Sequence, residues 1–466
     1  MSATTPEQLT LDVEPTNDAT TDATTSAHIV SSQVRRELKK IAPYDFPLLA
    51  AVVMLLGLGA VMVYSATINE MSQTVGDGAS KLKTHLMHMS IGIGVMLIAT
   101  FTPYKRLRTL TYPALVFTVL LLGMVVVVGV EAGNARRWLA LPGFNFQPAE
   151  VAKLVFVLFL AHSITKKAGN IRRFTVAFIP HFMVASVLIL LCLFQPDFGT
   201  SVLLVVVMFT MLFIAGTRLS YMTLFIFVGG FLAFQAVASN DMRLGRVLAA
   251  IDPWAHRDDR GYQMVSSQIA LGSGEIVGQG LGFGGQTLTG NLPEGETDFV
   301  LAVLGEQLGS VGIGFVALCF GVILWRGMRL AFATEEPFGR ALAFGLTLLL
   351  ILEAVINMLV AVALIPTKGL TLPFVSYGGS SMLVSCAAIG MLLNISRHAS
   401  WNTARAALPI IDALNAPAPA ADKQRPRYQV DMGRLGRVMA RFKKRRAQRV
   451  EDVLPTSSRE SREVNR

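Results

Sequence analysis

The sequence predicts an all-α integral membrane protein with about ten transmembrane helices, and three observations support this fold class. The 466 residues are 52% hydrophobic and only 15% charged, whereas soluble domains carry roughly a quarter charged residues. The mean hydropathy is +0.52. Apolar runs of helix length, such as residues 46–66, contain no charged residue. Because about 20 mostly apolar residues cross the hydrocarbon core of a bilayer, the chain is predicted to cross the membrane repeatedly.

Hydropathy, helix caps and helix breakers give the order of the spans and their orientation. The loops after the second, fourth and eighth spans are short and rich in Lys and Arg, which marks them as cytoplasmic. An even number of spans then places both termini of the membrane domain, residues 45–397, in the cytoplasm. The spans are expected at residues 46–66, 86–103, 112–130, 148–164, 175–194, 199–216, 220–238, 299–325, 341–364 and 373–395.

Two polar tails are predicted to flank the membrane domain. The tail 1–44 starts with a stretch rich in Thr, Ser, Asp and Glu that lacks the apolar segment of a signal peptide. The tail 398–466 is basic, and its residues 434–449 hold eight Lys or Arg among apolar residues. Two interpretations of residues 434–449 stay open: a solvated basic tail, or an amphipathic helix on the anionic inner leaflet.

One long loop, residues 239–298, joins the seventh and eighth spans. Loops of this length are usually functional or disordered, and this one carries aromatic and apolar residues that suit a membrane interface. The orientation argument places it outside the cytoplasm. Whatever chemistry the loop supports is therefore predicted to occur at the outer face of the membrane.

Charged residues within spans are functional candidates, because they are costly in lipid. Glu150 and Lys153 lie three residues apart at the start of the fourth span, on one helix face. They form either a pair that snorkels at the helix end or a buried pair facing a cavity. Glu353 lies in the middle of the ninth span, with Asn357 four residues later, and is expected to face the interior of the helix bundle.

Two further groups of charged residues lie between spans. Asp197, in the turn between the fifth and sixth spans, is either the cap of the next helix or a site residue. Arg136 and Arg137 lie on an outward loop, against the positive-inside bias. Because guanidinium groups match phosphate geometry, these two arginines indicate a substrate phosphate or lipid head groups at the outer leaflet.

Four carboxylates gather where the long loop enters the eighth span. Asp298 lies at the mouth of that helix, between Thr297 and Phe299, and partial desolvation there would raise its pKa toward the range of a general base. The alternative is a carboxylate that merely favours the positive end of the helix dipole. The four carboxylates are Glu294, Glu296, Asp298 and Glu306.

Other patterns do not indicate a function. The Gly-rich run 272–285 lacks the Lys-Ser/Thr pair and the preceding strand of a nucleotide-binding loop. No nucleic-acid-binding module is recognisable, so nucleic acid is not an expected partner. The net charge of +10 suits an anionic membrane surface, because the excess lies in short loops and in the C-terminal tail.

Five segments resemble the SEDS family, the shape, elongation, division and sporulation proteins of bacteria. The resemblance covers residues 45–397, with the segments in the family's order. Two of the segments, GEIVGQGLG and PTKGLTLPFVSYGGSS, resemble the division-type more than the elongation-type members. The five segments are NARRWLALPGFNFQPAEVAKL (134–154), QPDFGT (195–200), GYQMVSSQIALGSGEIVGQGLG (261–282), LPEGETDFVLAVLGEQLG (292–309) and IPTKGLTLPFVSYGGSS (365–381).

The resemblance implies a glycosyltransferase of the inner membrane, located at the division septum, that polymerises lipid II into peptidoglycan. It implies a class B penicillin-binding protein transpeptidase and other division proteins as partners. Asp298 matches the family's catalytic aspartate. The remaining matches are the basic pair Arg136 and Arg137, the cavity pair Glu150 and Lys153, and Asp197, with Glu294, Glu296, Thr297, Glu306 and Glu353 in supporting positions.

The sequence departs from the family's pattern at three positions near these residues. Glu296 stands where the family often has His, Gln307 follows Glu306 where a second Glu is usual, and Glu353 replaces a frequent Gln. The like charge of Glu296 is expected to raise the pKa of Asp298 further. A divalent cation on the substrate pyrophosphate is compatible with the chemistry, although no ligand set in the sequence demands one.

Three alternatives remain at this point. A lipid II flippase would use Glu150, Lys153 and Glu353 as a charged path through the membrane, but it has no need of a carboxylate in the outer loop. A non-enzymatic scaffold for division proteins is a second alternative. An elongation-type polymerase is the third.

Overall fold

The computed structural model describes residues 44–73, 77–132, 135–141, 144–171, 173–239, 241–288, 292–367 and 369–415. The chain divides into two compact units, residues 1–407 and 408–466. Of the second unit, the described part is the end of helix α15, which runs over Gly379–Asn415. The predicted tail 1–44 up to residue 43, and the basic segment 434–449, lie outside the described residues.

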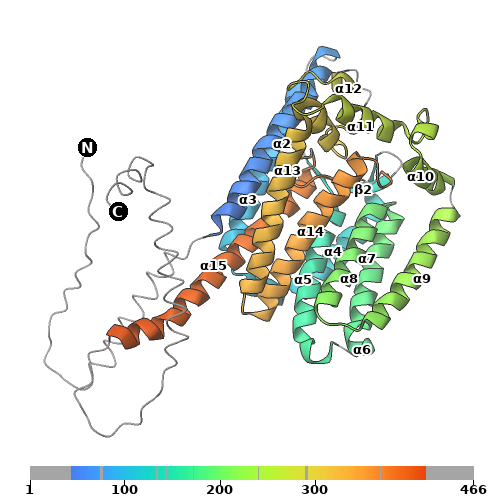
Figure 1. Ribbon diagram of the computed structural model, residues 1–466. Coiled ribbons are helices and arrows are strands. Elements are labelled where there is room, and N and C mark those ends of the chain that lie inside the picture. Colours follow the sequence, from blue (N-terminus) through green and yellow to red (C-terminus); the bar gives the residue numbers. More distant parts are fainter. Residues whose placement is uncertain are drawn as a thin grey trace, which may run out of the picture. The chain divides into compact units, whose positions relative to one another are not determined.

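Apolar helices occupy the positions predicted for the spans (Figure 1). Among the described residues, eight are long and apolar enough to cross a membrane. The helical membrane class is therefore confirmed. The count of ten stays a prediction, because α8 (Phe198–Ile214) and α9 (Leu219–Ala238) contain only shorter apolar stretches. The eight are α2 (Phe46–Gln73), α3 (Asp77–Phe101), α4 (Tyr104–Val128), α5 (Pro148–Lys166), α6 with α7 (Phe174–Ala177 and Ile179–Phe194), α13 (Val300–Ala333), α14 (Pro337–Ala361) and α15.

Local signals in the sequence explain where several helices begin. Helices α5 and α14 start at Pro148 and Pro337, because proline fits the first helical turn, where its missing N–H is not needed. Helix α8 starts after Asp197, whose carboxylate accepts a hydrogen bond from the Thr200 N–H at 3.0 Å. The interpretation of Asp197 as a helix cap is thus confirmed.

A bend in α13 brings the long loop against the bundle. Gly309 has φ 66° and ψ −165°, a conformation that favours glycine. A Cβ atom at this position would lie 2.3 Å from the Ile276 carbonyl oxygen. The N–H groups of Ser310 and Val311, freed by the bend, donate to the carbonyl oxygens of Glu275 and Ile276 at 3.0 and 3.2 Å. The bend therefore fixes loop residues directly onto the helix.

A small antiparallel sheet between α4 and α5 was not predicted from the sequence. Its strand order is β1-β2-β3, and Val130 pairs with Trp138 while Leu139 pairs with Phe146. The sheet holds the segment that contains Arg136 and Arg137. The strands are β1 (Val130–Ala132), β2 (Ala135–Leu141) and β3 (Phe144–Phe146).

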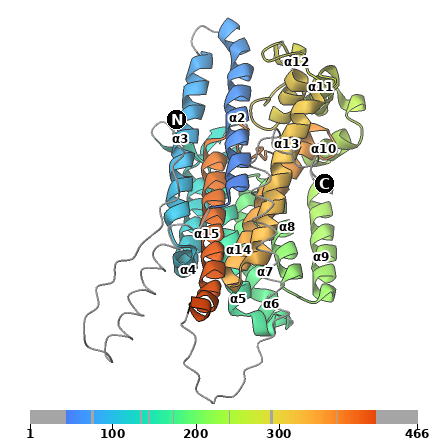
Figure 2. The same ribbon diagram turned by 60° about the vertical axis from the view of Figure 1, so that its left-hand side comes forward.

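About half of the long loop 239–298 folds into short helices. It contains α10 (Asp241–Ile251), the short helix η2 (Trp254–His256), α11 (Tyr262–Ser273) and α12 (Gly285–Leu288). In Figures 1 and 2, α11 and α12 lie at one end of the bundle, and α6 lies at the other end. Because α6 follows the basic connection after α5, the long loop and a predicted cytoplasmic loop lie at opposite ends, as the orientation argument requires.

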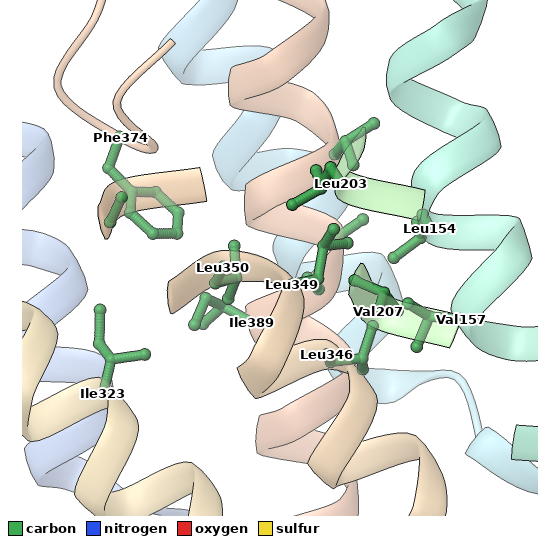
Figure 3. Packing of buried hydrophobic residues seen from close by; sticks show 14 of the residues in the cluster. Leu154, Val157, Leu203, Val207, Ile323, Leu346, Leu349, Leu350, Phe374 and Ile389 are labelled. Carbon is green, nitrogen blue, oxygen red and sulfur yellow. The ribbon is translucent and has the colours of Figure 1, made fainter. Parts of the chain in front are cut away.

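The core of the bundle is built around α5. Apolar residues are distributed around this helix on all sides, and 83% of its span is buried inside the protein. Figure 3 shows Leu154 and Val157 of α5 beside Leu203 and Val207 of α8, with α14 completing the cluster. A helix buried on all sides can present Glu150 and Lys153 only to other protein groups or to an internal cavity.

The outer helices expose large apolar side chains. On α9, Phe227 is 83% exposed, Phe231 is 61% exposed and Phe234 is 67% exposed. Exposed apolar surface of this extent would be unfavourable in water. It is the surface expected of a helix that faces lipid, in agreement with a multi-pass membrane protein.

Candidate active site

A polar cavity of about 340 Å³ brings together residues from distant parts of the chain. Its lining includes Arg137 from β2, Glu150 from the first turn of α5, and Glu294, Thr297 and Asp298 from the end of the long loop. The segment 367–381, between α14 and the start of α15, supplies another wall. Five of the residues singled out in the sequence therefore share one cavity.

A tight turn presents Asp298 to this cavity. The N–H groups of Thr297, Asp298 and Phe299 all point at the carbonyl oxygen of Glu294, each at 3.1 Å. Glu294 has φ 58°, and its carboxylate accepts a hydrogen bond from the Thr297 hydroxyl at 2.7 Å. The turn thereby fixes the Asp298 backbone just before α13 begins.

The segment after α14 holds the same turn from its other side. The Tyr377 N–H donates to the Glu296 carbonyl oxygen at 2.8 Å. The Ser376 hydroxyl donates to the Thr297 carbonyl oxygen at 2.6 Å. Two successive main-chain carbonyls beside Asp298 are therefore bound by a segment that also lines the cavity.

The surroundings of Asp298 give its carboxyl the pKa of a general base. Burial is the largest cause and raises the pKa of Asp298 to about 7. The negative charge of Glu294 raises this pKa further, the positive charge of Arg137 lowers it, and Asp197 adds a weaker rise. The expectation that Glu296 raises the pKa is wrong, because its carboxylate instead pairs with Lys81 of α3, with Nζ and Oε1 2.6 Å apart.

The two arginines of β2 have different surroundings. Arg137 donates from Nε to the Gln195 carbonyl oxygen at 3.2 Å and from Nη2 to the Pro196 carbonyl oxygen at 2.5 Å. It contributes to the cavity wall. Arg136 instead lies 3.4 Å from the carboxylate of Glu131 across the sheet and is exposed. The structure therefore places Arg137, and not Arg136, beside Asp298.

Lys153 lies between two buried carboxylates. Its Nζ is 2.8 Å from Glu150 Oε2 within α5, and Glu353 of α14 contacts the same nitrogen. All three side chains are at most 6% exposed. The interpretation as a snorkelling pair is therefore wrong, and the predicted buried pair is in fact a group of three. Glu150 also reaches the cavity, whereas Lys153 and Glu353 lie behind it.

Besides Glu353, two more of the predicted supporting carboxylates, Glu296 and Glu306, lie outside the cavity wall. Glu296 pairs with Lys81, as described above. Glu306 is fully buried and accepts a hydrogen bond from the Gln286 N–H at 2.6 Å, which attaches α12 to α13. Both residues connect the long loop to the helices.

The sequence analysis missed several residues of the cavity. Arg246 of α10 and Gln263 of α11 line it, together with Thr367, Gly369 and Tyr377. The segment 365–381 contributes to the sequence-based prediction only through the resemblance, although its run of small polar residues before a span is a usable signal. The amphipathic character of residues 241–251 was the signal for Arg246.

The carboxylates that line the cavity are the candidate ligands for a cation on the substrate. Among the residues that the structure describes, no three or more His, Cys, Asp or Glu gather as a metal site. Glu150, Glu294 and Asp298 line the cavity and offer the oxygen ligands that Mg²⁺ prefers.

Comparisons with known proteins agree on one family. The family described as cell cycle proteins, named for FtsW, RodA and SpoVE, matches residues 46–401. A probable peptidoglycan glycosyltransferase FtsW of Geobacter sulfurreducens is 40% identical over 361 residues, which cover 77% of this chain and 96% of the relative. The stage V sporulation protein E of Bacillus subtilis is 34% identical over 370 residues, with 78% and 99% covered.

Solved structures show the same fold. A chain from a study of the structural coordination of polymerization and crosslinking by a peptidoglycan synthase complex gives a TM-score of 0.64 at 28% identity, covering 77% of this chain and 98% of that one. The rod shape determining protein RodA of Thermus thermophilus gives a TM-score of 0.58 at 27% identity, covering 76% and 97%.

Proposed function

The chain belongs to the FtsW, RodA and SpoVE family of cell cycle proteins, and from this membership we propose the chemistry of its cavity. The protein is a peptidoglycan glycosyltransferase of the division type, and the resemblance inferred from the five motifs is confirmed. Its substrate in this proposal is lipid II, a disaccharide peptide linked to undecaprenyl pyrophosphate. Asp298 acts as the general base.

The proposed reaction joins two lipid-linked sugars. The 4-hydroxyl of one sugar attacks the anomeric carbon of the other, a new glycosidic bond forms, and the bond to the pyrophosphate breaks. Asp298 accepts the hydroxyl proton, which a carboxylate with a pKa of about 7 does well near neutral pH. Arg137 stabilises the negative charge that develops on the departing pyrophosphate.

One observation carries this proposal: Asp298 and Arg137, which both lie outside the candidate spans, line the same cavity. A base and a phosphate-binding cation are the two groups that the reaction requires, and both lie on rigid supports, a main-chain turn and a sheet. A divalent cation on the pyrophosphate, contacted by carboxylates of the cavity, stays part of the proposal. It would add further positive charge at the leaving group.

The buried ion group supports polymerisation more than transport. A flippase would need Glu150, Lys153 and Glu353 to be available along a path, whereas they are bound to one another. Their arrangement suits a structural role behind the cavity.

The partners and the location complete the proposal. A related chain comes from a complex that couples polymerization to crosslinking, so a class B penicillin-binding protein transpeptidase is the proposed partner, together with other division proteins. We place the protein in the inner membrane at the septum, with the long loop outside and both termini in the cytoplasm.

The test uses purified protein with its cognate transpeptidase and fluorescent lipid II in detergent. Asp298→Asn is expected to form no glycan ladder, because an amide cannot accept the proton. Asp258→Asn is the matched control, since Asp258 lies in the same loop with its side chain 89% exposed. Glycan formation by Asp298→Asn at the rate of this control would refute the assignment.

A further inference from the structure

Asn357 of α14 is bound to the backbone of two segments that line the cavity. Its Nδ2 donates one hydrogen bond to the Asp298 carbonyl oxygen at 2.9 Å and another to the Leu370 carbonyl oxygen at 2.8 Å. The side chain is 1% exposed. Asn357 therefore joins the turn of Asp298 to the start of the segment after α14, in addition to the Ser376 hydroxyl.

The chemistry of this position requires a side-chain amide. Two main-chain carbonyls face one atom, and only an NH₂ group offers both a neutral charge and two donors in this geometry. The amide oxygen, Oδ1, is buried with no hydrogen-bond partner among the described residues. The Asn357 side chain therefore leaves its own oxygen without a hydrogen bond while its NH₂ group binds two carbonyls of other segments. This cost indicates that the two donated hydrogen bonds are the function of the side chain.

The position of Asn357 is itself fixed by the buried ion group. Glu353 lies one turn earlier on the same face of α14 and contacts Lys153 of α5. This ion pair holds α14 against the central helix of the bundle. Because α14 is fixed in this way, the hydrogen bond from Asn357 fixes the backbone of Asp298 relative to the bundle.

We propose that Asn357 is a positioning residue for catalysis, which holds the Asp298 carboxyl at its place in the cavity by binding the Asp298 and Leu370 carbonyls at once. This inference rests on the proposed function of Asp298. Gly369, the residue next to Leu370, shows why the position of this segment affects the site. A Cβ atom on Gly369 would lie 3.2 Å from Arg137 Nη1 and 3.9 Å from Asp298 Oδ2. A shift of the segment would therefore move it against both groups proposed to act in the reaction.

The test compares Asn357→Ala and the nearly isosteric Asn357→Asp with the control Asn394→Ala. Asn394 is also a buried asparagine that joins two segments: it donates to the Thr100 carbonyl oxygen at 2.7 Å and accepts from the Tyr104 N–H at 3.0 Å. It does not line the cavity. All rates are measured on monodisperse protein, so that loss of folded enzyme does not count as loss of catalysis.

Both Asn357 variants are expected to lower kcat by about 10- to 100-fold with little change in KM for lipid II, since small displacements of a catalytic group cost rates of that order. Asn357→Asp keeps the size of the side chain, but an ionised carboxylate cannot donate to the two carbonyls. In Asn357→Ala the acid limb of the pH profile should also move to lower pH, because a loosened Asp298 is less buried. In Asn357→Asp the new negative charge near Asp298 opposes this shift, so that variant is compared by its rate alone. Asn394→Ala should leave the midpoint of the profile unchanged.

An unchanged pH midpoint in Asn357→Ala, together with a rate loss in both Asn357 variants no larger than that of Asn394→Ala, would overturn the inference. Asp298→Asn, measured in the same series, separates this outcome from failure of the proposed function. If Asp298→Asn is inactive while the Asn357 variants behave like the control, only the positioning role is wrong. If Asp298→Asn is active, the proposed base itself is wrong.

Discussion

The pKa of the Asp298 carboxyl depends on a few neighbouring groups, and substitution can separate their effects. Burial accounts for most of the rise in its pKa, Glu294 adds to it, and Arg137 opposes it. Each of these influences belongs to a named side chain or to the cavity wall. Single substitutions should therefore move the pH dependence of the reaction in a direction fixed by charge.

Replacement of Glu294 tests the electrostatic part of this description. Glu294→Gln removes a negative charge that disfavours ionisation of Asp298, so the pKa of Asp298 should fall. Because the base must be ionised, activity should then persist to lower pH than in the wild-type protein. The acid limb of kcat/KM measures this shift, with the exposed Glu335→Gln at the other end of α13 as control. A shift to higher pH would contradict the prediction.

Replacement of Gly369 tests the spacing of the cavity wall. The new methyl group of Gly369→Ala would lie 3.2 Å from Arg137 Nη1, and Arg137 cannot yield freely because two carbonyls bind it. We expect kcat/KM to fall by about tenfold without loss of thermal stability. Gly272→Ala is the matched control, since no atom lies within 4 Å of a Cβ there. Equal activity of the two variants would argue against the wall as described.

The ion group that joins α5 and α14 contributes to the thermal stability of the helix bundle. Lys153→Ala leaves two buried carboxylates without their cation, and breaking a buried pair costs about 3–5 kcal/mol. Glu353→Gln keeps the contact of Lys153 with Glu150 and should cost less. Thermal unfolding in detergent measures which of the two variants loses more stability. A larger loss for Glu353→Gln would contradict the arrangement of three charges.

Exchange of Glu150 and Lys153 is expected to fail for the same reason. A carboxylate at position 153 would face Glu353 across the helix interface. Helical spacing in the sequence reveals only the partner three residues away. The partner from α14 lies 200 positions later in the chain, and a pattern in the sequence carries no such information.

Hydropathy predicted the helices well, and it predicted the connections poorly. The starts at Pro148 and after Asp197 were readable because proline and a capping carboxylate act locally. The sheet at residues 130–146 was missed, since three short strands with charged residues give no clear alternating pattern. Helices α10 to α12 were missed inside the long loop for a similar reason: they are short and only partly apolar.

Motifs that are distant in sequence line one cavity. Asp298 and Arg137 could be singled out by residue type and motif. Their common cavity, and the exclusion of Arg136 from it, depend on strand register and on hydrogen bonds to the turn at residues 195–196. The role of Asn357 was equally hidden, because it acts through two main-chain carbonyls and not through a charge.

The orientation in the membrane can be tested by labelling introduced cysteines in intact spheroplasts. Asp258→Cys lies in the long loop and Asn170→Cys lies in the basic connection after α5, and both positions are exposed. A membrane-impermeant maleimide should label only Asp258→Cys. The native Cys192, Cys319 and Cys386 are buried and should give a low background. Labelling of Asn170→Cys from outside would reverse the proposed topology.

The central claim is that an ionised Asp298 removes the proton from the attacking hydroxyl. The most direct measurement is the pH dependence of kcat/KM for lipid II polymerisation by the purified wild-type protein with its transpeptidase partner. A base with a pKa of about 7 is neutral and inactive below that pH, so the rate should rise tenfold per pH unit and level off above about pH 7. A rate that stays constant from well below to well above this pH would contradict the claim.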